Sequence, residues 1–117
     1  MITEPQKSGV FGELYASRFL RNKGYEILVS NYRAKGGEID LIVRKDNTVS
    51  FVEVKTRNTD SFFSPSDAVD EQKETNIKNT AAVFLSQSKI DAEVTYDIIE
   101  VILDKEKYAI KHTINAF

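Results

Sequence analysis

Two neighbouring segments, residues 38–44 and 49–56, most constrain what this chain can fold into. They read EIDLIVR and VSFVEVKT, and both are rich in the β-branched and aromatic residues that strands prefer. Asp46 and Asn47 lie between them and favour a tight turn, although the usual glycine is absent. We therefore expect a β-hairpin at this point of the chain.

Three charged residues stand within these otherwise apolar strands. Asp40 is in the first strand, and Glu53 and Lys55 are two residues apart in the second. Because side chains alternate between the faces of a strand, Glu53 and Lys55 share a face, and the hairpin can bring Asp40 within reach of both. The solvated face of an edge strand would also explain this pattern, but apolar neighbours such as Val52 and Val54 indicate a central strand.

This set of charges suits the metal-dependent hydrolysis of a phosphodiester. A divalent ion neutralises the phosphate, activates water and stabilises the leaving oxygen. Mg²⁺ and Mn²⁺ prefer oxygen ligands, which Asp40, Glu53 and the backbone carbonyl of Val54 can supply. Lys55 would hold the attacking water or stabilise the developing charge on the phosphate. The sequence therefore predicts a Mg²⁺ or Mn²⁺ site on the hairpin.

The composition is that of one globular domain spanning residues 1–117. Hydrophobic residues make up 41% of the chain and charged residues 29%, which is ordinary for a soluble protein. Cysteine is absent, which excludes a thiolate metal site, and we interpret the single histidine, His112, as an ordinary residue at a strand end. Neither a signal peptide nor an apolar run of membrane-spanning length is visible, so we expect a cytoplasmic protein without membrane contact.

The remainder of the chain predicts two helices and three more strands. Residues 8–23 read as a largely buried helix that Gly24 ends, and a second helix should begin between residues 66 and 71 and end near Ser88. The order αβββαββ predicts an α/β fold of the α+β sandwich type, with an αβββαβ core and a mixed central sheet. The three further strands are expected at residues 25–31, 94–103 and 108–113.

Glu13 is a further candidate for the site. It lies on a stripe of the first predicted helix with Ala16, Ser17 and Leu20, at spacings of three, four and seven residues. The small side chains of this stripe suit close packing, so Glu13 faces either inward or onto a solvated flank of the helix.

Lys73 and Asp97 are expected beside the site without binding metal, and Asp97 either supports the side chains of the site or has a structural role. Lys73 has a core-facing position near the start of the second helix, and we expect its stem to extend outward to water rather than into the site. Asp97 lies in an apolar strand and needs a partner, for which Lys55 and Arg57 are candidates.

Six motifs stand in order along nearly the whole chain. They are GE at residues 12–13, GGEIDLI at 36–42, FVEVKTR at 51–57, SPSDAV at 64–69, YDIIEV at 96–101 and NAF at 115–117. Together they resemble the YraN-like family of bacterial proteins, which is similar to the PD-(D/E)XK, restriction-endonuclease-like superfamily, near the archaeal Holliday junction resolvases. The resemblance implies a restriction-endonuclease-like αβββαβ core with a metal site on its central strands.

The same resemblance assigns roles to individual residues. Asp40 matches the site aspartate of the family, Glu53 and Lys55 match its E-x-K motif, and Glu13 matches its helix-borne glutamate, which favours an inward position. It implies a Mg²⁺- or Mn²⁺-dependent endonuclease that acts on DNA, including branched or flapped DNA. The alternatives are a non-catalytic module that binds nucleic acid or a repair protein and retains the nuclease fold, and a phosphodiesterase acting on a small nucleotide.

The charge distribution favours DNA as the partner of the first half of the chain. Residues 1–57 carry 10 Lys and Arg against 7 Asp and Glu, whereas residues 58–117 carry 6 against 11. Action on a two-fold symmetric junction would require a homodimer, for which Phe62 and Phe63, either tucked into the core or exposed, are the only hint. The predicted contacts with nucleic acid are Arg18, Arg21, Arg33, Lys35, Arg44 and Arg57.

Overall fold

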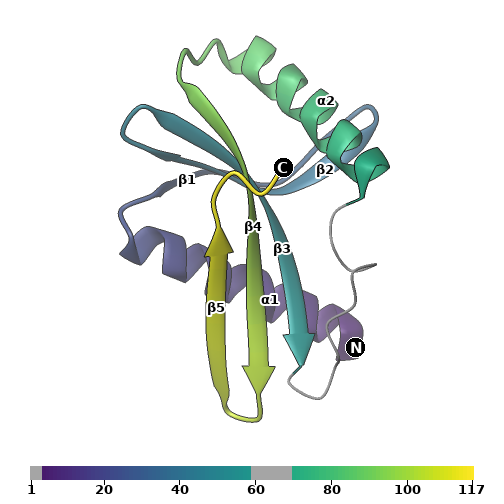
Figure 1. Ribbon diagram of the computed structural model, residues 1–117, viewed down its shortest axis with the longest axis vertical. Coiled ribbons are helices and arrows are strands. Elements are labelled where there is room, and N and C mark those ends of the chain that lie inside the picture. Colours follow the sequence, from purple (N-terminus) through teal and green to yellow (C-terminus); the bar gives the residue numbers. More distant parts are fainter. Residues whose placement is uncertain (1–3, 59–69) are drawn as a thin grey trace.

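The computed structural model describes residues 4–58 and 70–117, with side chains from Phe11 onward. Phe62 and Phe63 lie outside the described residues. The element order confirms the predicted αβββαββ arrangement, and the fold is α+β (Figure 1). The elements are α1 (Glu4–Asn22), β1 (Glu26–Ala34), β2 (Gly37–Lys45), β3 (Thr48–Asn58), α2 (Glu71–Ser88), β4 (Glu93–Asp104) and β5 (Lys107–Thr113).

The described strands form one five-stranded mixed sheet in the order β1-β2-β3-β4-β5. β1, β2 and β3 pair antiparallel, as do β4 and β5, whereas β3 and β4 run parallel. A parallel pair needs a crossover between its strands, and α2 lies within this one. β3 therefore occupies the centre of the sheet, as the apolar residues around Glu53 predicted.

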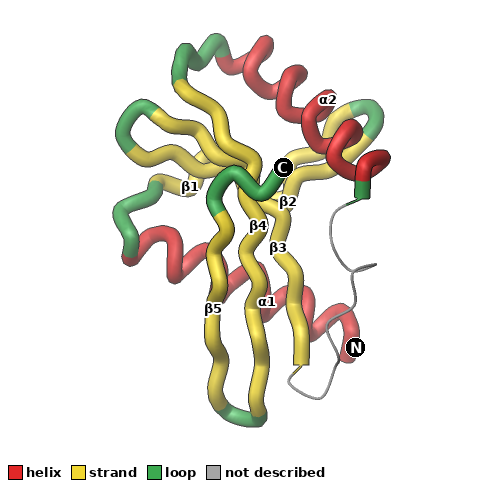
Figure 2. The backbone as a smooth tube through the Cα atoms, viewed as in Figure 1, coloured by secondary structure: helices red, strands yellow, loops and turns green. Residues whose placement is uncertain are grey.

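The two helices cover opposite faces of this sheet (Figure 2). α1 packs Ala16 and Leu20 into one buried cluster, which includes Val52 of β3. α2 packs Ile77 into the other cluster, which includes Phe51. Consecutive residues of β3 thus belong to different faces, as the two-residue period of a strand requires. Glu53 and Lys55 share the phase of Phe51 and lie on the face that α2 covers.

α1 differs from its prediction in length and in burial. It begins at Glu4 rather than at Ser8, so residues 4–7 are also helical. Gly24 follows its end with a φ of +93°, as expected of a residue in the left-handed conformation. Phe11 and Leu14 are 45% and 56% exposed, so only one stripe of the helix is buried rather than most of its circumference.

α2 begins directly after Asp70, one of the predicted start points. The Asp70 side chain accepts a hydrogen bond from the backbone N–H of Lys73 at 2.8 Å and caps the helix. This cap fixes Lys73 in the first turn of α2. The first strand extends to Ala34 rather than ending at Asn31, because pairing with β2 continues beyond Asn31 although this residue adopts a φ of +54°.

Within residues 4–58 and 70–117, no helix is both long and apolar enough to cross a membrane.

Candidate metal-binding site

The site is built where the strands β2 and β3 separate. Their backbone pairing runs from Lys45 and Thr48 at the turn to Leu41 and Val52, and Asp40 and Glu53 follow directly beyond this last pair. At this point an Asp40 carboxylate oxygen accepts a hydrogen bond from the backbone N–H of Val54 at 2.8 Å. A side chain therefore takes the place of a strand partner and holds Asp40 between the two strands.

The carboxyl groups of Asp40 and Glu53 meet in this gap, close enough to share a hydrogen bond. Glu53 is 8% exposed. Burial raises the pKa of Asp40 to about 7, and the charges of Glu53 and Glu13 add to the rise, while the hydrogen bond from Val54 opposes it. This coupling of the two carboxyl groups confirms that the hairpin brings Asp40 to Glu53, and two carboxylates so placed attract a cation.

Lys73 reaches into the site from α2, contrary to the expected outward course of its stem. Its Nζ lies 3.1 Å from Oε1 of Glu53. Burial alone would lower the pKa of Lys73, but its hydrogen bond with Lys55 and the Glu53 and Asp40 carboxylates together raise it. A buried carboxylate requires a charged partner, and α2 packs on the same face of the sheet as Glu53, which explains the inward position.

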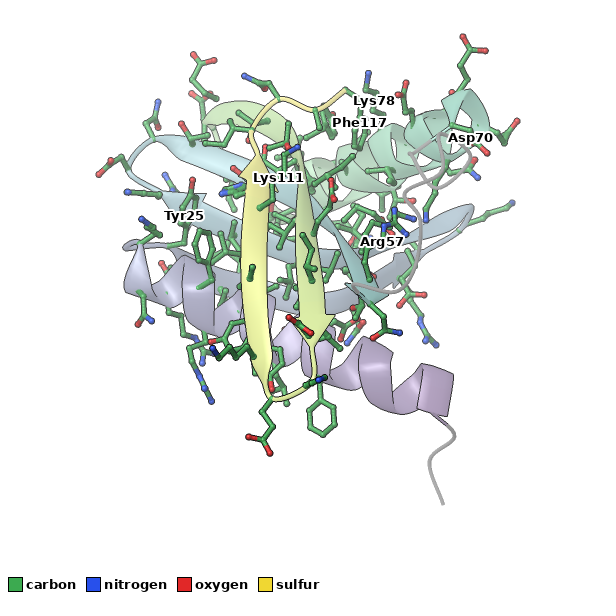
Figure 3. The ribbon with its side chains drawn as sticks, turned by 60° about the horizontal axis from the view of Figure 1, so that its bottom comes forward. Tyr25, Arg57, Asp70, Lys78, Lys111 and Phe117 are labelled. Atoms are coloured by element: carbon green, nitrogen blue, oxygen red, sulfur yellow. The ribbon has the colours of Figure 1, made fainter. Side chains whose placement is uncertain are left out.

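Lys55 lies beside Lys73, on the same face of β3 as Glu53. Burial lowers the pKa of Lys55, and the neighbouring charges of Lys73 and Arg57 lower it further, while Glu53 opposes them. Arg57 continues this face, and Figure 3 shows it on the same side of the molecule as Asp70 at the start of α2. The E-x-K motif therefore directs a carboxylate and an amine into one space, as the strand period predicted.

A cavity of about 240 Å³ opens over these groups, between β2, β3 and α2. Asp40, Glu53 and Lys73 line its charged wall. At Gly37 an added Cβ would lie 2.7 Å from Oγ1 of Thr80 on α2, so this close approach of sheet and helix requires glycine. The full lining is Gly37, Glu38, Asp40, Glu53, Lys73, Asn76 and Ile77.

Glu13 approaches the site from α1, on the other face of the sheet. An added Cβ at Gly12 would overlap Oγ1 of Thr56, so glycine lets the helix backbone contact β3 closely. The Glu13 carboxylate accepts a hydrogen bond from the Asn31 side chain at 3.3 Å, and its charge raises the pKa of Asp40. Glu13 is half-buried, and its charge is close enough to act on Asp40.

The donor set fits a hard divalent cation. Asp40 and Glu53 supply carboxylate oxygens, and the Val54 carbonyl points to the same strand edge as its N–H. Among the residues that the structure describes, no three His, Cys, Asp or Glu side chains come together as a metal-binding group. Mg²⁺ commonly takes only one or two carboxylates and completes its shell with water and phosphate. Ligation by Glu13, directly or through water, stays a prediction.

Asp97 has a different partner from those expected. It is fully buried, and its carboxylate lies 2.8 Å from Nε2 of His112 and accepts a hydrogen bond from the backbone N–H of Asn115. Because β5 pairs with β4, His112 comes to the face that α1 covers, away from Lys55 and Arg57. Asp97 therefore holds β5 and the C-terminal residues, and His112 is more than an ordinary residue at a strand end.

The predicted nucleic-acid contacts lie at two ends of the molecule. Arg33 lies near the end of β1 and Lys35 in the turn between β1 and β2, and Arg33 pairs with Glu38 of the cavity wall at 3.6 Å. Arg44 lies at the opposite end of β2, where its Nε donates to the Asp46 carbonyl at 3.3 Å. Arg18 and Arg21 are exposed on α1. Arg33, Lys35 and Arg57 are thus the members of this set nearest the cavity.

Two residues of the site were not anticipated from the sequence. Asn31 holds Glu13, and its positive φ inside a strand is the signal of an unusual position. Asn76 lines the cavity, and its position three residues after Lys73 on α2 places both on one face of the helix. The helical period could have identified Asn76 once Lys73 was known to point inward.

Comparison with known proteins gives one family. The family model described as Uncharacterised protein family UPF0102 matches residues 12–101. A UPF0102 protein of Alkaliphilus oremlandii is 44% identical over 115 residues, covering 96% of this chain and 98% of the relative. A UPF0102 protein of Syntrophomonas wolfei is 41% identical over 110 residues, covering 93% of this chain and 96% of the relative. One of Caldanaerobacter subterraneus is 43% identical over 113 residues, covering 93% of each chain.

Proposed function

This chain belongs to the uncharacterised protein family UPF0102, the YraN-like family that its motifs resemble, and from the geometry of its site we propose that it is a metal-dependent nuclease that hydrolyses DNA. The strongest support is the meeting of the Asp40 and Glu53 carboxyl groups at the end of the β2–β3 pairing, with Lys55 on the same face. Two carboxyl groups this close repel each other when both are ionised, and a divalent cation bound to both removes that repulsion.

Each residue of the site has a role in this proposal. Asp40, Glu53 and the Val54 carbonyl would hold Mg²⁺ or Mn²⁺, with Glu13 directly or through water. The bound ion would neutralise the scissile phosphate and lower the pKa of a water molecule. Lys55 lies beside these carboxylates and would stabilise the charge that develops on the phosphate oxygens.

The shape of the site favours a large substrate over a small nucleotide. The cavity measures about 240 Å³, below the range of about 300 to 1,000 Å³ usual for small-molecule sites. Exposed cations lie beside its edge, at Arg33 and Lys35. A DNA backbone can cross such an open site and place one phosphate at the carboxylates.

The direct test is cleavage of labelled duplex, flapped and four-way-junction DNA with Mn²⁺ or Mg²⁺. We expect the purified protein to cut at least one of these substrates, a chelator to abolish cutting, and Asp40→Asn to lose it while remaining folded. The Asp40→Asn protein, purified in the same way, controls for contaminating nucleases. Equal cutting by both proteins, or none on any substrate with either ion, would contradict the proposal.

The oligomeric state separates two classes of DNA substrate. A four-way junction is two-fold symmetric, so symmetric cleavage of it needs a homodimer with two sites. Sedimentation of the protein bound to junction DNA measures this directly. A monomer on the junction would contradict junction resolution and leave flapped DNA as the substrate.

One observation favours the alternative of a non-catalytic binding module. The ion pair between Glu53 and Lys73 provides Glu53 with a cation that is not a metal. A protein that binds DNA or a repair protein, fails to bind Mn²⁺ and retains its stability would be such a module.

A further inference from the structure

Lys73 and Glu53, which both line the cavity, form an ion pair with each other. Their atoms Nζ and Oε1 are 3.1 Å apart, and the side chains are 42% and 9% exposed. A carboxylate as buried as Glu53 requires a cationic partner. Within the part of the chain that the structure describes, the ion-pair partner of Glu53 is Lys73 of α2 and not a residue of its own strand.

The same contact places a positive charge where a metal ion would bind. Lys73, Glu53 and Asp40 line one cavity, and the Asp40 and Glu53 carboxyl groups share a hydrogen bond there. A divalent ion held by both carboxylates would compete with the ammonium group of Lys73 for the same oxygen atoms. The two cations would also repel each other across a small and partly dry space.

We propose that Lys73 is an internal counter-cation that occupies Glu53 in the metal-free protein, and that a divalent ion must displace it to bind. The inference rests on the metal site of the proposed function. It goes beyond that function, because it makes Lys73 a determinant of metal affinity and not only a neighbour of the site.

The structure allows this displacement. The lysine side chain has a flexible four-carbon stem and is partly exposed, so its ammonium group can move to water while α2 stays in place. The Asp70 cap holds the backbone of Lys73 and not its side chain. After displacement the free ammonium group lies at the cavity edge, where a DNA phosphate can replace Glu53 as its partner.

Such an exchange couples the binding of metal to the binding of DNA. In the absence of DNA, displacing Lys73 costs its contact with Glu53, which weakens metal binding. A phosphate that accepts Lys73 removes this cost, so DNA should increase metal affinity, and by linkage metal should increase DNA affinity to the same extent.

The test is calorimetric titration of the full chain with Mn²⁺, without DNA, comparing the wild type with Lys73→Met. Methionine retains much of the stem and removes the charge. We expect Lys73→Met to bind Mn²⁺ about tenfold more tightly or better, the scale of one charge-assisted hydrogen bond. Lys73→Gln, which is also neutral but polar, should behave in the same way.

Lys78 supplies the matched control on the same helix. Its Nζ lies 5.4 Å and 5.9 Å from the ring centroids of Tyr96 and Phe117, Figure 3 shows it beside Phe117, and it does not line the cavity. Lys78→Met changes the net charge equally, so it should leave Mn²⁺ affinity unchanged. An equal gain in both variants would assign the effect to net charge and overturn the inference.

A second measurement tests the pairing itself. In a Glu53→Gln background, Lys73→Met should no longer increase Mn²⁺ affinity, because the contested carboxylate is absent. Without metal, Lys73→Met should unfold at a lower temperature than the wild type, and Mn²⁺ should raise its unfolding temperature by more than it raises that of the wild type.

The outcomes distinguish this inference from the proposed function. Equal or weaker Mn²⁺ binding by Lys73→Met, with DNA cleavage by the wild type intact, would overturn the role of Lys73 and leave the nuclease proposal standing. Tighter binding by Lys73→Met without DNA cleavage by the wild type would support Lys73 as a counter-cation in a non-catalytic protein. Absence of Mn²⁺ binding in every variant would overturn both.

Discussion

The carboxylate of Asp40 accepts a hydrogen bond from the backbone N–H of Val54 at 2.8 Å, directly beyond the last backbone pair between β2 and β3. The contact joins Asp40, a candidate metal ligand, to the strand that carries Glu53, the other candidate carboxylate ligand. Because the Val54 amide belongs to the central strand, the position of Asp40 is fixed by the sheet and not by a loop. The candidate ligands are therefore held in place before any ion binds.

Metal binding should depend on pH through Asp40. The pKa of this carboxyl is raised to about 7, so it carries a proton below that pH and a metal ion must displace it. We expect the apparent Kd for Mn²⁺ to rise about tenfold for each pH unit below 7 and to be nearly constant above pH 8. Calorimetric titration at pH 6, 7 and 8 measures this; equal affinity at all three would contradict the raised pKa.

Asp40→Asn should be more stable than the wild type at pH 8 in the absence of metal. The folded carboxyl has a pKa of about 7 against 3.8 as the ordinary value, so between these values the folded state binds more protons than the unfolded state. The stability of the wild type therefore falls as the pH rises from 4 to 7, whereas asparagine does not titrate. We expect Asp40→Asn to have an unfolding free energy about 2 kcal/mol higher than the wild type at pH 8, a value that allows for the partial exposure of Asp40. This difference should shrink toward pH 4. Urea unfolding of both proteins in the presence of a chelator, at pH values from 4 to 8, tests this prediction. A difference in stability between them that does not change with pH would contradict it.

Lys55→Ala should reduce DNA cleavage much more than DNA binding. The amino group lies beside the carboxylates, and the proposed function assigns it to the charge that develops during the reaction, so its loss acts on turnover. Lys55→Arg should not restore the rate fully, because a planar guanidinium group does not replace a compact ammonium group. Single-turnover kinetics and binding measured on the same DNA separate the two effects. Unchanged cleavage by Lys55→Ala would assign this residue to structure.

The pair of Asp97 and His112 should contribute strongly to stability and not to the site. Asp97 is fully buried, and His112→Ala would leave its carboxylate with only the N–H of Asn115. We expect His112→Ala to lose about 3 kcal/mol of unfolding free energy, as is typical when one partner of a buried pair is removed. Lys111→Ala, an exposed neighbour on β5, should change stability by less than about 0.5 kcal/mol. Similar urea midpoints for both variants would exclude a structural role for the pair.

DNA binding should depend on salt and on the cations nearest the cavity. Affinity should fall steeply with ionic strength, because each contact with a phosphate releases a counterion. Arg33→Ala and Lys35→Ala should each weaken DNA binding. Each should also reduce the slope of log affinity against log salt concentration by about 1. Arg44→Ala is the matched control, since Arg44 lies at the opposite end of β2. Fluorescence anisotropy at several salt concentrations measures this; equal losses for all three would indicate that DNA does not approach from the cavity side.

The sequence by itself determined the order of the elements and the first members of the site. Apolar alternation identified the strands around Asp40 and Glu53, and the two-residue period placed Glu53 and Lys55 on one face. The hairpin then brought Asp40 to Glu53, because these residues are only 13 positions apart and joined by a short turn. Local periodicity suffices for such contacts.

Only the tertiary structure decided the partners of the charged residues outside the hairpin. Whether Lys73 pointed to water or to Glu53 depended on how α2 lies across the sheet, and its helical period allowed both. Asp97 met His112 rather than Lys55 because the pairing of β5 with β4 selects which residues face α1. Contacts of this kind join distant parts of the chain, so their geometry follows from the packing of whole elements, and a buried charge takes whichever partner that packing brings within reach.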